Sequence, residues 1–209
     1  MTEPAADRQI RVVLADDQAL VRGALAALLS LEDGIDVVGE AGRGDELVTL
    51  VDEVRPDVAL VDIEMPGLDG IAATAQITAA HPDVACLIVT TFGRPGYLQR
   101  ALEAGARGFI VKETPADELA QAVRDVHAGK KVVDPALATE SLFSGANPLT
   151  DREREVLKLA LSGKRVADIA AKIYLSEGTV RNHLSSAIGK LGVDTRGEAA
   201  RRAQELGWL

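Results

Sequence analysis

Aromatic residues are scarce in this chain of 209 residues, where Phe, Tyr and Trp together make up 3%. Proteins that bind single-stranded nucleic acid commonly stack the bases on aromatic side chains, so this class of function is disfavoured. The hydrophobic fraction is nevertheless 47%. A core of ordinary size is therefore expected, built from Val, Leu, Ile and Ala.

The chain also lacks a cysteine pair and a long apolar run. Its single cysteine, Cys86, lies in the apolar stretch VACLIVTTF, which predicts a buried thiol and excludes a disulfide within the chain. The N-terminal segment MTEPAADRQI is charged, and no apolar run of about 18 residues occurs. We expect a cytoplasmic protein with no membrane partner.

Charge is unevenly distributed along the chain. Residues 1–147 contain 12 Lys and Arg against 24 Asp and Glu, a net charge of −12, whereas residues 148–209 contain 11 against 8, a net charge of +3. Such asymmetry is typical of an acidic module joined to one that approaches a polyanion.

Five short, β-branched apolar runs in the first part of the chain have the length of strands, at residues 10–15, 35–41, 57–63, 85–91 and 107–112. Between them, apolar residues recur at helical spacing. Strands that are apolar on both faces belong in a parallel sheet covered by helices on each side. We therefore predict an α/β fold with a five-stranded parallel sheet.

Two helices of this unit carry more detailed predictions. In the last helix, Thr114 is expected to be the N-cap and Pro115 to occupy the first turn. In the first helix, the apolar residues at helical spacing are Leu20, Ala24, Leu25 and Leu28.

Polar side chains follow four of the predicted strands: Asp16 and Asp17, then Asp62, Thr90 and Lys112. In parallel α/β sheets, ligands bind beyond the carboxyl ends of the strands. Three converging carboxylates would repel one another unless they shared a cation, and oxygen ligands favour Mg²⁺. The sequence therefore predicts a magnesium site at this edge of the sheet.

Asp62 is the predicted nucleophile at that edge. Phosphoryl transfer needs an attacking carboxylate, a cation that neutralises the phosphoryl oxygens, and a donor, and Lys112 and Thr90 supply the last two groups beside the metal. The sequence VDIEMPGLDG also places Pro66 and Gly67 in a tight loop after Asp62. An isolated acid after a strand is commonly a helix cap or a solvated residue, but the combination favours chemistry.

The stretches LADDQALVRGALAALL, DVALVDIEMPGLDG, LIVTTF and ARGFIVKE resemble the receiver domain of two-component response regulators over residues 9–128. The resemblance implies a flavodoxin-like (CheY-like) fold in which a sensor histidine kinase phosphorylates Asp62. One departure is Glu113, which stands where the family usually has proline. The further roles implied are Asp17 as a direct Mg²⁺ ligand, Asp16 as a second acid acting partly through water, the backbone carbonyl of Glu64 as another ligand, Thr90 and Lys112 as phosphoryl contacts, and Phe109 as the aromatic whose rotamer follows Thr90.

The chain changes character at residues 129–147, GKKVVDPALATESLFSGAN. Its Gly, Pro, Ser and Asn predict a linker, in which DPALATESLF could form a short helix. Residues 148–209 then predict a small all-α domain. Thr150 and Glu153 form a capping box, Ser176 caps a later helix, and Trp208 is placed to seal the core after a last helix that ends at Gly207.

Two short helices joined by a tight turn are the outline of a helix-turn-helix. The stretches LTDREREVLKLALSG, IAAKIYLSEGTVRNHLSSAIGKLGV and TRGEAARRA resemble the LuxR-type DNA-binding domain of the NarL/FixJ regulators. The resemblance implies that the helix from residue 177 to about 190 enters the major groove, although a solvated polar face is the alternative. The implied contacts are Thr179 and Lys190 to phosphates, and Arg181, Asn182, Ser185 and Ser186 to base edges or nearby phosphates.

We therefore predict a two-component response regulator and transcription factor that dimerises on phosphorylation, through the first and fifth receiver helices by resemblance, and binds double-stranded promoter DNA. RNA polymerase is a candidate further partner. Two stretches, TTFGRPGYLQRALEAG and NPLTDREREVL, resemble regulators of membrane-lipid desaturase genes, which suggests that promoter class.

Two alternative functions remain open. A metal-dependent phosphohydrolase also uses an aspartyl nucleophile, with a second acid two residues later, where this chain has Glu64. It has no need of a DNA-binding domain, however. The other alternative is a DNA-binding regulator that works without phosphorylation, which the complete acidic set and Lys112 disfavour. We do not expect an enzyme, beyond acceptance of a phosphoryl group and its slow loss to water.

Overall fold

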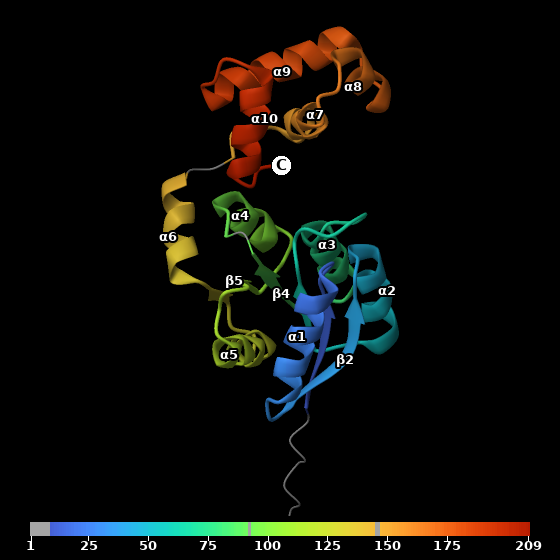
Figure 1. Ribbon diagram of the computed structural model, residues 1–209, viewed down its shortest axis with the longest axis vertical. Coiled ribbons are helices and arrows are strands. Elements are labelled where there is room, and N and C mark those ends of the chain that lie inside the picture. The colour runs from blue at the N-terminus through green and yellow to red at the C-terminus, as the bar shows by residue number, and fades with distance from the viewer. Residues whose placement is uncertain (1–8, 92, 145–146) are drawn as a thin grey trace, which may run out of the picture. The chain divides into compact units, whose positions relative to one another are not determined.

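The computed structural model describes residues 9–91, 93–144 and 147–209. The chain divides into two compact units, with the main division after residue 138. The first is an α/β unit and the second is helical, and Figure 1 labels the helices and some of the strands. Within the described ranges, no helix is both long and apolar enough to cross a lipid bilayer.

The first unit is built on a parallel sheet with the strand order β2-β1-β3-β4-β5-β6. The five predicted strands are confirmed. The strands are β1 (Ile10–Ala15), β2 (Ile35–Ala41), β3 (Val58–Val61), β4 (Ala85–Thr90), β5 (Gly108–Val111) and the short β6 (Val132–Val133). The winding direction reverses between β1 and β3, so the carboxyl ends of these two neighbours flank the crevice where such folds bind ligands.

Helices alternate with the first five strands and cover the sheet on both faces. They are α1 (Ala19–Ser30), α2 (Gly44–Val54), α3 (Gly70–Ala80), α4 (Pro95–Glu103) and α5 (Ala116–His127). On one face, Leu29 of α1 and Val123 of α5 pack against Leu60 and Leu87 of the sheet. Every residue of β3 and β4 is buried, as expected for central parallel strands, and Cys86 is among them.

The apolar pattern of α1 does not coincide with its buried side. Leu29 is buried and Leu25 partly so, whereas Leu20 and Leu31 are 87% and 82% exposed and Ala24 and Leu28 are also exposed. Hydrophobic residues occur all around this helix, so their spacing could not select the side that meets the sheet. Leu20 and Leu28 of the helix and Leu31 at its C-cap are therefore left exposed.

The predicted cap of α5 is wrong by one residue. Pro115 occupies the N-cap position with no side-chain cap, and the helix begins at Ala116. The backbone N–H of Thr114 donates instead to the carbonyl of Val111, in a turn that leaves β5. That turn places Thr114 outside the helix end.

The segment predicted as a linker has regular structure. Val132 and Val133 extend the sheet as β6, in register with Gly108 and Phe109 of β5. Asp134 then caps α6 (Pro135–Ser144), and its Oδ1 accepts hydrogen bonds from the N–H groups that follow. The helix was anticipated from the sequence. The strand was not, because two valines are too short a run to show a strand pattern.

The second unit packs its helices around a small aliphatic core. The helices are α7 (Asp151–Leu161), α8 (Val166–Lys172), α9 (Glu177–Leu191) and α10 (Arg196–Glu205). The Thr150–Glu153 capping box and the Ser176 cap are confirmed. Trp208 is 6% exposed and belongs to this core, as predicted. The short turn between α8 and α9 gives the unit the outline of a helix-turn-helix.

Candidate functional site

The carboxyl ends of β1 and β3 bring three acids together. One carboxylate oxygen from each of Asp16, Asp17 and Asp62 lies within 4.8 Å of the others. Asp16 and Asp62 are only 2% and 3% exposed, whereas Asp17 is exposed to solvent. The arrangement follows from topology, because β1 and β3 are hydrogen-bonded neighbours and each ends directly before its aspartate.

Lys112, which follows β5, supplies the counter-charge. Its Nζ lies 2.6 Å from Asp16 Oδ2 and 3.0 Å from Asp62 Oδ2, so one ammonium bridges two buried carboxylates. Burial lowers the pKa of Lys112, but its close interactions with the Asp16 and Asp62 carboxylates outweigh this effect and the net pKa is raised. Lys112 therefore stays charged at neutral pH.

Asp62 remains short of compensating charge. Burial raises the pKa of Asp62 above its ordinary value, and the hydrogen bond from Lys112 only partly opposes this shift. Its Oδ1 also accepts a hydrogen bond from the N–H of Ile63 at 2.8 Å. Three acids and one lysine leave a surplus of negative charge, which disfavours the ionised form of the buried member.

The donor set fits a hard divalent cation. Asp16 Oδ2 is buried and, although close to Lys112 Nζ, has no well-aligned hydrogen-bond partner. Carboxylate oxygens are the ligands that Mg²⁺ prefers. Asp16, Asp17 and Asp62 could therefore hold such an ion, which would relieve their mutual repulsion.

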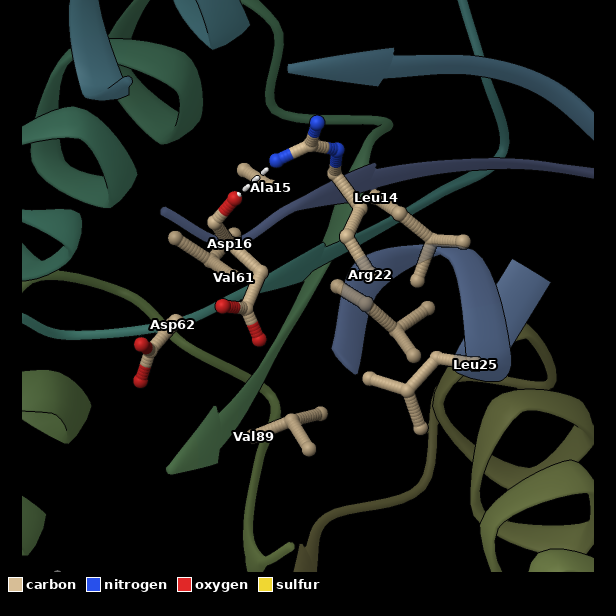
Figure 2. A pocket seen from close by; sticks show the side chains of 9 residues that line it. Leu14, Ala15, Asp16, Arg22, Leu25, Val61, Asp62 and Val89 are labelled. Atoms are coloured by element: carbon tan, nitrogen blue, oxygen red, sulfur yellow. Dashed lines mark hydrogen bonds between the residues drawn. The ribbon is translucent and has the colours of Figure 1, made fainter. Parts of the chain in front are cut away.

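A small cavity lies behind these acids, lined by Asp16 and Asp62 together with Leu14, Leu25 and Val89 (Figure 2). Its volume is about 10 Å³, which is about the room that one water molecule needs. The cavity is too small for a metabolite, so it offers no substrate pocket of the kind that a small-molecule hydrolase requires.

Thr90 and Phe109 lie on β4 and β5, the next two strands of the sheet beyond β3. Thr90 ends β4 and is buried, and its carbonyl accepts a hydrogen bond from the N–H of Lys112 at 2.9 Å. Phe109 is fully buried in β5, where it pairs in register with Ile88. The structure thus brings the predicted hydroxyl and aromatic residue to the strands that end beside the acids.

The loop after Asp62 is shaped by glycine. Gly67 has a positive φ of 78°, and a Cβ at Gly70 would lie 1.9 Å from the carbonyl oxygen of Asp62. Only glycine permits α3 to begin this close to the phosphoacceptor candidate. Glu64 lies in this loop with an exposed side chain, and the role of its carbonyl as a metal ligand stays a prediction.

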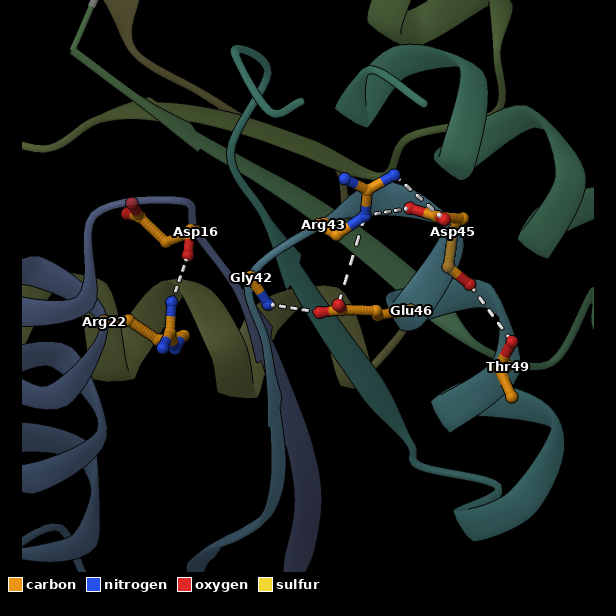
Figure 3. A network of polar contacts seen from close by, with 7 residues as sticks. All are labelled: Asp16, Arg22, Gly42, Arg43, Asp45, Glu46 and Thr49. Carbon is orange, nitrogen blue, oxygen red and sulfur yellow. Dashed lines mark hydrogen bonds and ion pairs between the residues drawn. The ribbon is translucent and has the colours of Figure 1, made fainter. Parts of the chain in front are cut away.

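Two arginines near the acidic edge were not anticipated. Arg22 of α1 donates to the carbonyl of Asp16 at 2.5 Å. Arg43, which precedes α2, binds Asp45, and its guanidinium lies against the loop at Gly67, where a Cβ would come within 2.5 Å of Nη2. Figure 3 shows both contacts of the arginines with Asp16 and Asp45. No sequence spacing signals them, because they depend on how α1 and α2 pack beside the strand ends.

The second candidate site is the outer face of α9. Arg181, Asn182 and Ser185 are exposed, while Val180, Leu184, Ala187 and Leu191 face the core. Thr179 is half-buried, and its N–H donates to Ser176 Oγ at the helix N-terminus. Arg181 forms an exposed ion pair with Glu177 on the same helix. The helix is thus amphipathic in the way the sequence predicts.

Ser186 and Lys190 are exposed as well, but they differ from the other residues expected to contact DNA because each binds Glu153. Ser186 Oγ donates to Glu153 Oε1, and Lys190 Nζ donates to Glu153 Oε2, each at 2.7 Å. Glu153 was predicted only as a capping residue of α7. Its two contacts with α9 were missed, because the partners are 33 and 37 residues away in sequence.

Comparison with known families covers both units. Residues 12–124 match the model of the response regulator receiver domain, and residues 147–203 match that of the bacterial regulatory proteins of the luxR family. The transcriptional regulatory protein DesR of Bacillus subtilis (strain 168) is 46% identical over 202 residues, which cover 96% of this chain and 99% of DesR.

Solved structures agree with these matches. The crystal structure of the response regulator ChrA, of a heme-sensing two-component system, is 35% identical with a TM-score of 0.58, and the match covers 97% of this chain and all of that one (100%). The structure of a complex of the response regulator RcsB with DNA is 27% identical with a TM-score of 0.65, covering 96% of this chain and 99% of that one.

Proposed function

The chain belongs to the two-component response regulators that join a receiver domain to a LuxR-type DNA-binding domain, and from this membership we propose how its two sites work. It is a transcription factor and not a typical enzyme. We propose a receiver at residues 9–128, a connecting segment at residues 129–147 and a DNA-binding domain at residues 148–209. A cytoplasmic location is part of the same proposal.

Asp62 is the proposed phosphoacceptor. One carboxylate oxygen attacks the phosphorus of a phosphohistidine on a sensor kinase, a P–O bond forms as the P–N bond breaks, and the imidazole leaves. The observation that carries this assignment is the burial of Asp62 with its Oδ2 only 3.0 Å from Lys112 Nζ, beside two further acids. Lys112 and Thr90 then hold the phosphoryl oxygens, and slow hydrolysis returns the aspartate.

Magnesium is the proposed cofactor of this step. Asp16, Asp17, Asp62 and the carbonyl of Glu64 form the proposed ligand set, in which Asp16 acts partly through water. When bound, Mg²⁺ supplies positive charge that neutralises the phosphoryl oxygens. The surplus of carboxylates over Lys112 supports this proposal.

The proposed output is dimerisation followed by binding to promoter DNA. Phe109 and Thr90 are the proposed switch pair, and α1 with α5 the proposed receiver contact, which the exposed side chains of Leu20, Leu28 and Leu31 support. A symmetric dimer would place its recognition helices on half-sites about one helical turn apart. That the RcsB structure contains DNA supports the DNA-binding part.

On DNA, α9 is the proposed recognition helix. Its exposed Arg181, Asn182 and Ser185 are the proposed base-reading residues, and Thr179 is a proposed phosphate contact. Ser186 and Lys190 belong to the set expected from the family resemblance, and their contacts with Glu153 are considered below. A desaturase promoter, the class suggested by the sequence resemblance, is the proposed target, and RNA polymerase is a proposed further partner.

Phosphorylation is tested with acetyl phosphate and Mg²⁺, with intact mass as the readout. We expect wild-type protein to gain one phosphoryl group and Asp62→Asn to gain none. Asp69→Asn is the matched control, because Asp69 lies in the same loop and caps α3 through the N–H of Ala72. Equal labelling of wild type and Asp62→Asn would overturn the assignment.

The same preparation separates the alternative functions. Repeated release of phosphate from small phosphate esters would favour a hydrolase. Unchanged oligomeric state on addition of beryllofluoride would favour a regulator that works without phosphorylation. We expect no turnover and a shift from monomer to dimer.

DNA recognition is tested by two matched arginine variants. Arg181 and Arg165 are both exposed; Arg181 pairs with Glu177 on α9, and Arg165, at the N-cap of α8, pairs with Asp168. We expect Arg181→Ala to lower affinity for a selected duplex by about tenfold or more and to relax base preference. Arg165→Ala should leave base preference unchanged, and equal effects of the two variants would contradict the assignment of α9.

A further inference from the structure

Glu153 is a buried carboxylate that ties α7 to α9. It is 3% exposed, and its two oxygens accept hydrogen bonds from three donors. Oε1 accepts from the hydroxyl of Ser186. Oε2 accepts from the ammonium of Lys190 and from the backbone N–H of Thr150, each at 2.7 Å. One side chain therefore serves both the capping box of α7 and the contact with α9.

The electrostatics make this contact strong. Burial alone would raise the pKa of Glu153, but the hydrogen bonds from Lys190, Ser186 and the N–H of Thr150 lower it to about 2. Glu153 is therefore fully ionised at neutral pH. The charge of Lys190 is compensated within the domain, and hydrogen bonds to a buried ionised group are worth more than exposed ones.

The two anchoring residues are four apart on α9, so they lie one above the other on the same face of the helix. Contacts at Ser186 and Lys190 fix both the rotation and the axial position of α9 against α7. Arg181, Asn182 and Ser185 precede both of these residues on the same helix. The contacts of Glu153 with Ser186 and Lys190, here called the anchor, therefore help to set the directions of these three side chains.

We propose that Glu153 is a positioning residue for DNA recognition, which holds α9 in register and keeps Lys190 and Ser186 engaged within the domain instead of at the DNA. Base reading then falls on Arg181, Asn182 and Ser185. This inference rests on the proposed DNA-binding function. It gives Lys190 and Ser186 a different role from the one their family positions imply.

The first test measures recognition. Full-length protein activated with beryllofluoride is titrated by fluorescence anisotropy with two duplexes, one selected by wild type from a random library and one scrambled. We expect Glu153→Gln to lower affinity for the selected duplex by about tenfold, the size of one lost base contact, with affinity for the scrambled duplex nearly unchanged. Ser186→Ala removes one hydrogen bond to Glu153 without leaving a charge unpaired, so it should lower affinity for the selected duplex by less.

Glu198→Gln is the matched control. Glu198 forms the capping box at the start of α10, where its Oε2 accepts hydrogen bonds from the N–H groups of Asp194 and Thr195. It should leave the ratio of the two affinities unchanged. Circular dichroism confirms folding of each variant.

The second test asks whether Lys190 contacts DNA phosphates. If it did, Lys190→Met would lower the slope of log affinity against log salt by about 0.9. We expect the slope to stay unchanged. A lowered slope, or an unchanged affinity ratio in Glu153→Gln, would overturn the inference.

A readout without DNA separates this inference from the proposed function. Carbon-13 NMR of the Glu153 carboxyl should give a pKa of about 2 in wild type, with a clear rise in Lys190→Met. If wild type selected no duplex, the DNA-binding function would fail, while this titration would still judge the anchor. An ordinary pKa in wild type would overturn the anchor itself.

Discussion

Each unit of the molecule contains a buried carboxylate paired with a lysine, and the two pairs are balanced differently. In the receiver, Lys112 is shared by Asp16 and Asp62, and burial raises the pKa of Asp62. In the DNA-binding domain, Glu153 alone receives Lys190 and two further donors, and its pKa is about 2. Pairing with a lysine thus leaves the ionised form of Asp62 destabilised and the ionised form of Glu153 stabilised.

The difference distinguishes a carboxylate suited to bind a ligand, Asp62, from one that holds two helices together, Glu153. A buried acid with too few partners retains a tendency to bind a cation or a phosphoryl group, and such perturbed groups cluster at functional sites. An acid held by several donors is already engaged, and its removal leaves those donors unpaired. Removing the negative charge should therefore have opposite effects on stability in the two domains.

The largest effect is expected from Glu153→Ala, which leaves Lys190 and the N–H of Thr150 without their acceptor. Loss of one partner from a buried pair should destabilise the DNA-binding domain by about 3 kcal/mol. Urea unfolding followed by the fluorescence of Trp208, the one tryptophan of the chain, measures it in this domain. Glu155→Ala on the same helix, which removes an exposed pair with Arg152, should cost less than about 1 kcal/mol.

The second largest effect is expected from low pH, which should lower the free energy of unfolding of the DNA-binding domain. The folded pKa of Glu153 is about 2 against an ordinary value of 4.5, so the unfolded state binds the proton more readily and stability is lost as pH falls from 4.5 toward 2. The loss is at most about 3 kcal/mol. Trp208 fluorescence at several pH values measures it, and Lys190→Met should flatten the dependence. An identical profile in both proteins would contradict the pairing.

In the receiver domain, removal of a buried carboxylate should increase the free energy of unfolding instead of lowering it. Asp62→Asn removes one carboxylate from a site with surplus acid, and Lys112 keeps Asp16 as its partner, so we expect a gain of about 1 kcal/mol. Amide hydrogen exchange of β3 and β4 measures receiver stability separately. Because the folded pKa of Asp62 is raised, its contribution in wild type is present at low pH and lost as pH rises through that pKa. Asp69→Asn should have almost no effect on stability, since Asn caps a helix as well as Asp does. If Asp62→Asn destabilised the receiver, the two buried carboxylates would not differ in their effect on stability.

The smallest effect is expected from Glu198→Gln. This capping box is exposed and carries no second role, so its loss should cost about 0.5 kcal/mol. Trp208 fluorescence in urea gives the comparison with Glu153 directly. A cost equal to that of Glu153→Gln would mean that capping alone accounts for the behaviour of both residues.

The sheet and the acidic site were predictable because they depend on local pattern and on one rule of topology. The strands at 10–15 and 35–41 end where the apolar runs end, and the carboxyl ends of parallel strands share an edge, so Asp16, Asp62 and Lys112 had to meet. The resemblance to known families then supplied roles for these positions.

The unpredicted contacts depend on the angles at which helices pack. Arg22 reaches Asp16 and Glu153 reaches Lys190 only because of tertiary placement, and no spacing in sequence encodes either pair. The side of α1 that faces the sheet was equally undetermined, because leucine and alanine occur around its whole circumference. These features required the folded arrangement.

The strand β6 has a mechanical consequence for signalling. Val133 is in register with Phe109, and the N–H of Asp134 donates to the carbonyl of Phe109. The chain therefore leaves the receiver while still fastened to the strand that carries the proposed switch aromatic, with no slack between them. A displacement of β5 on phosphorylation would therefore move β6 and the start of α6 with it, because the hydrogen bonds between β5 and β6 couple them directly.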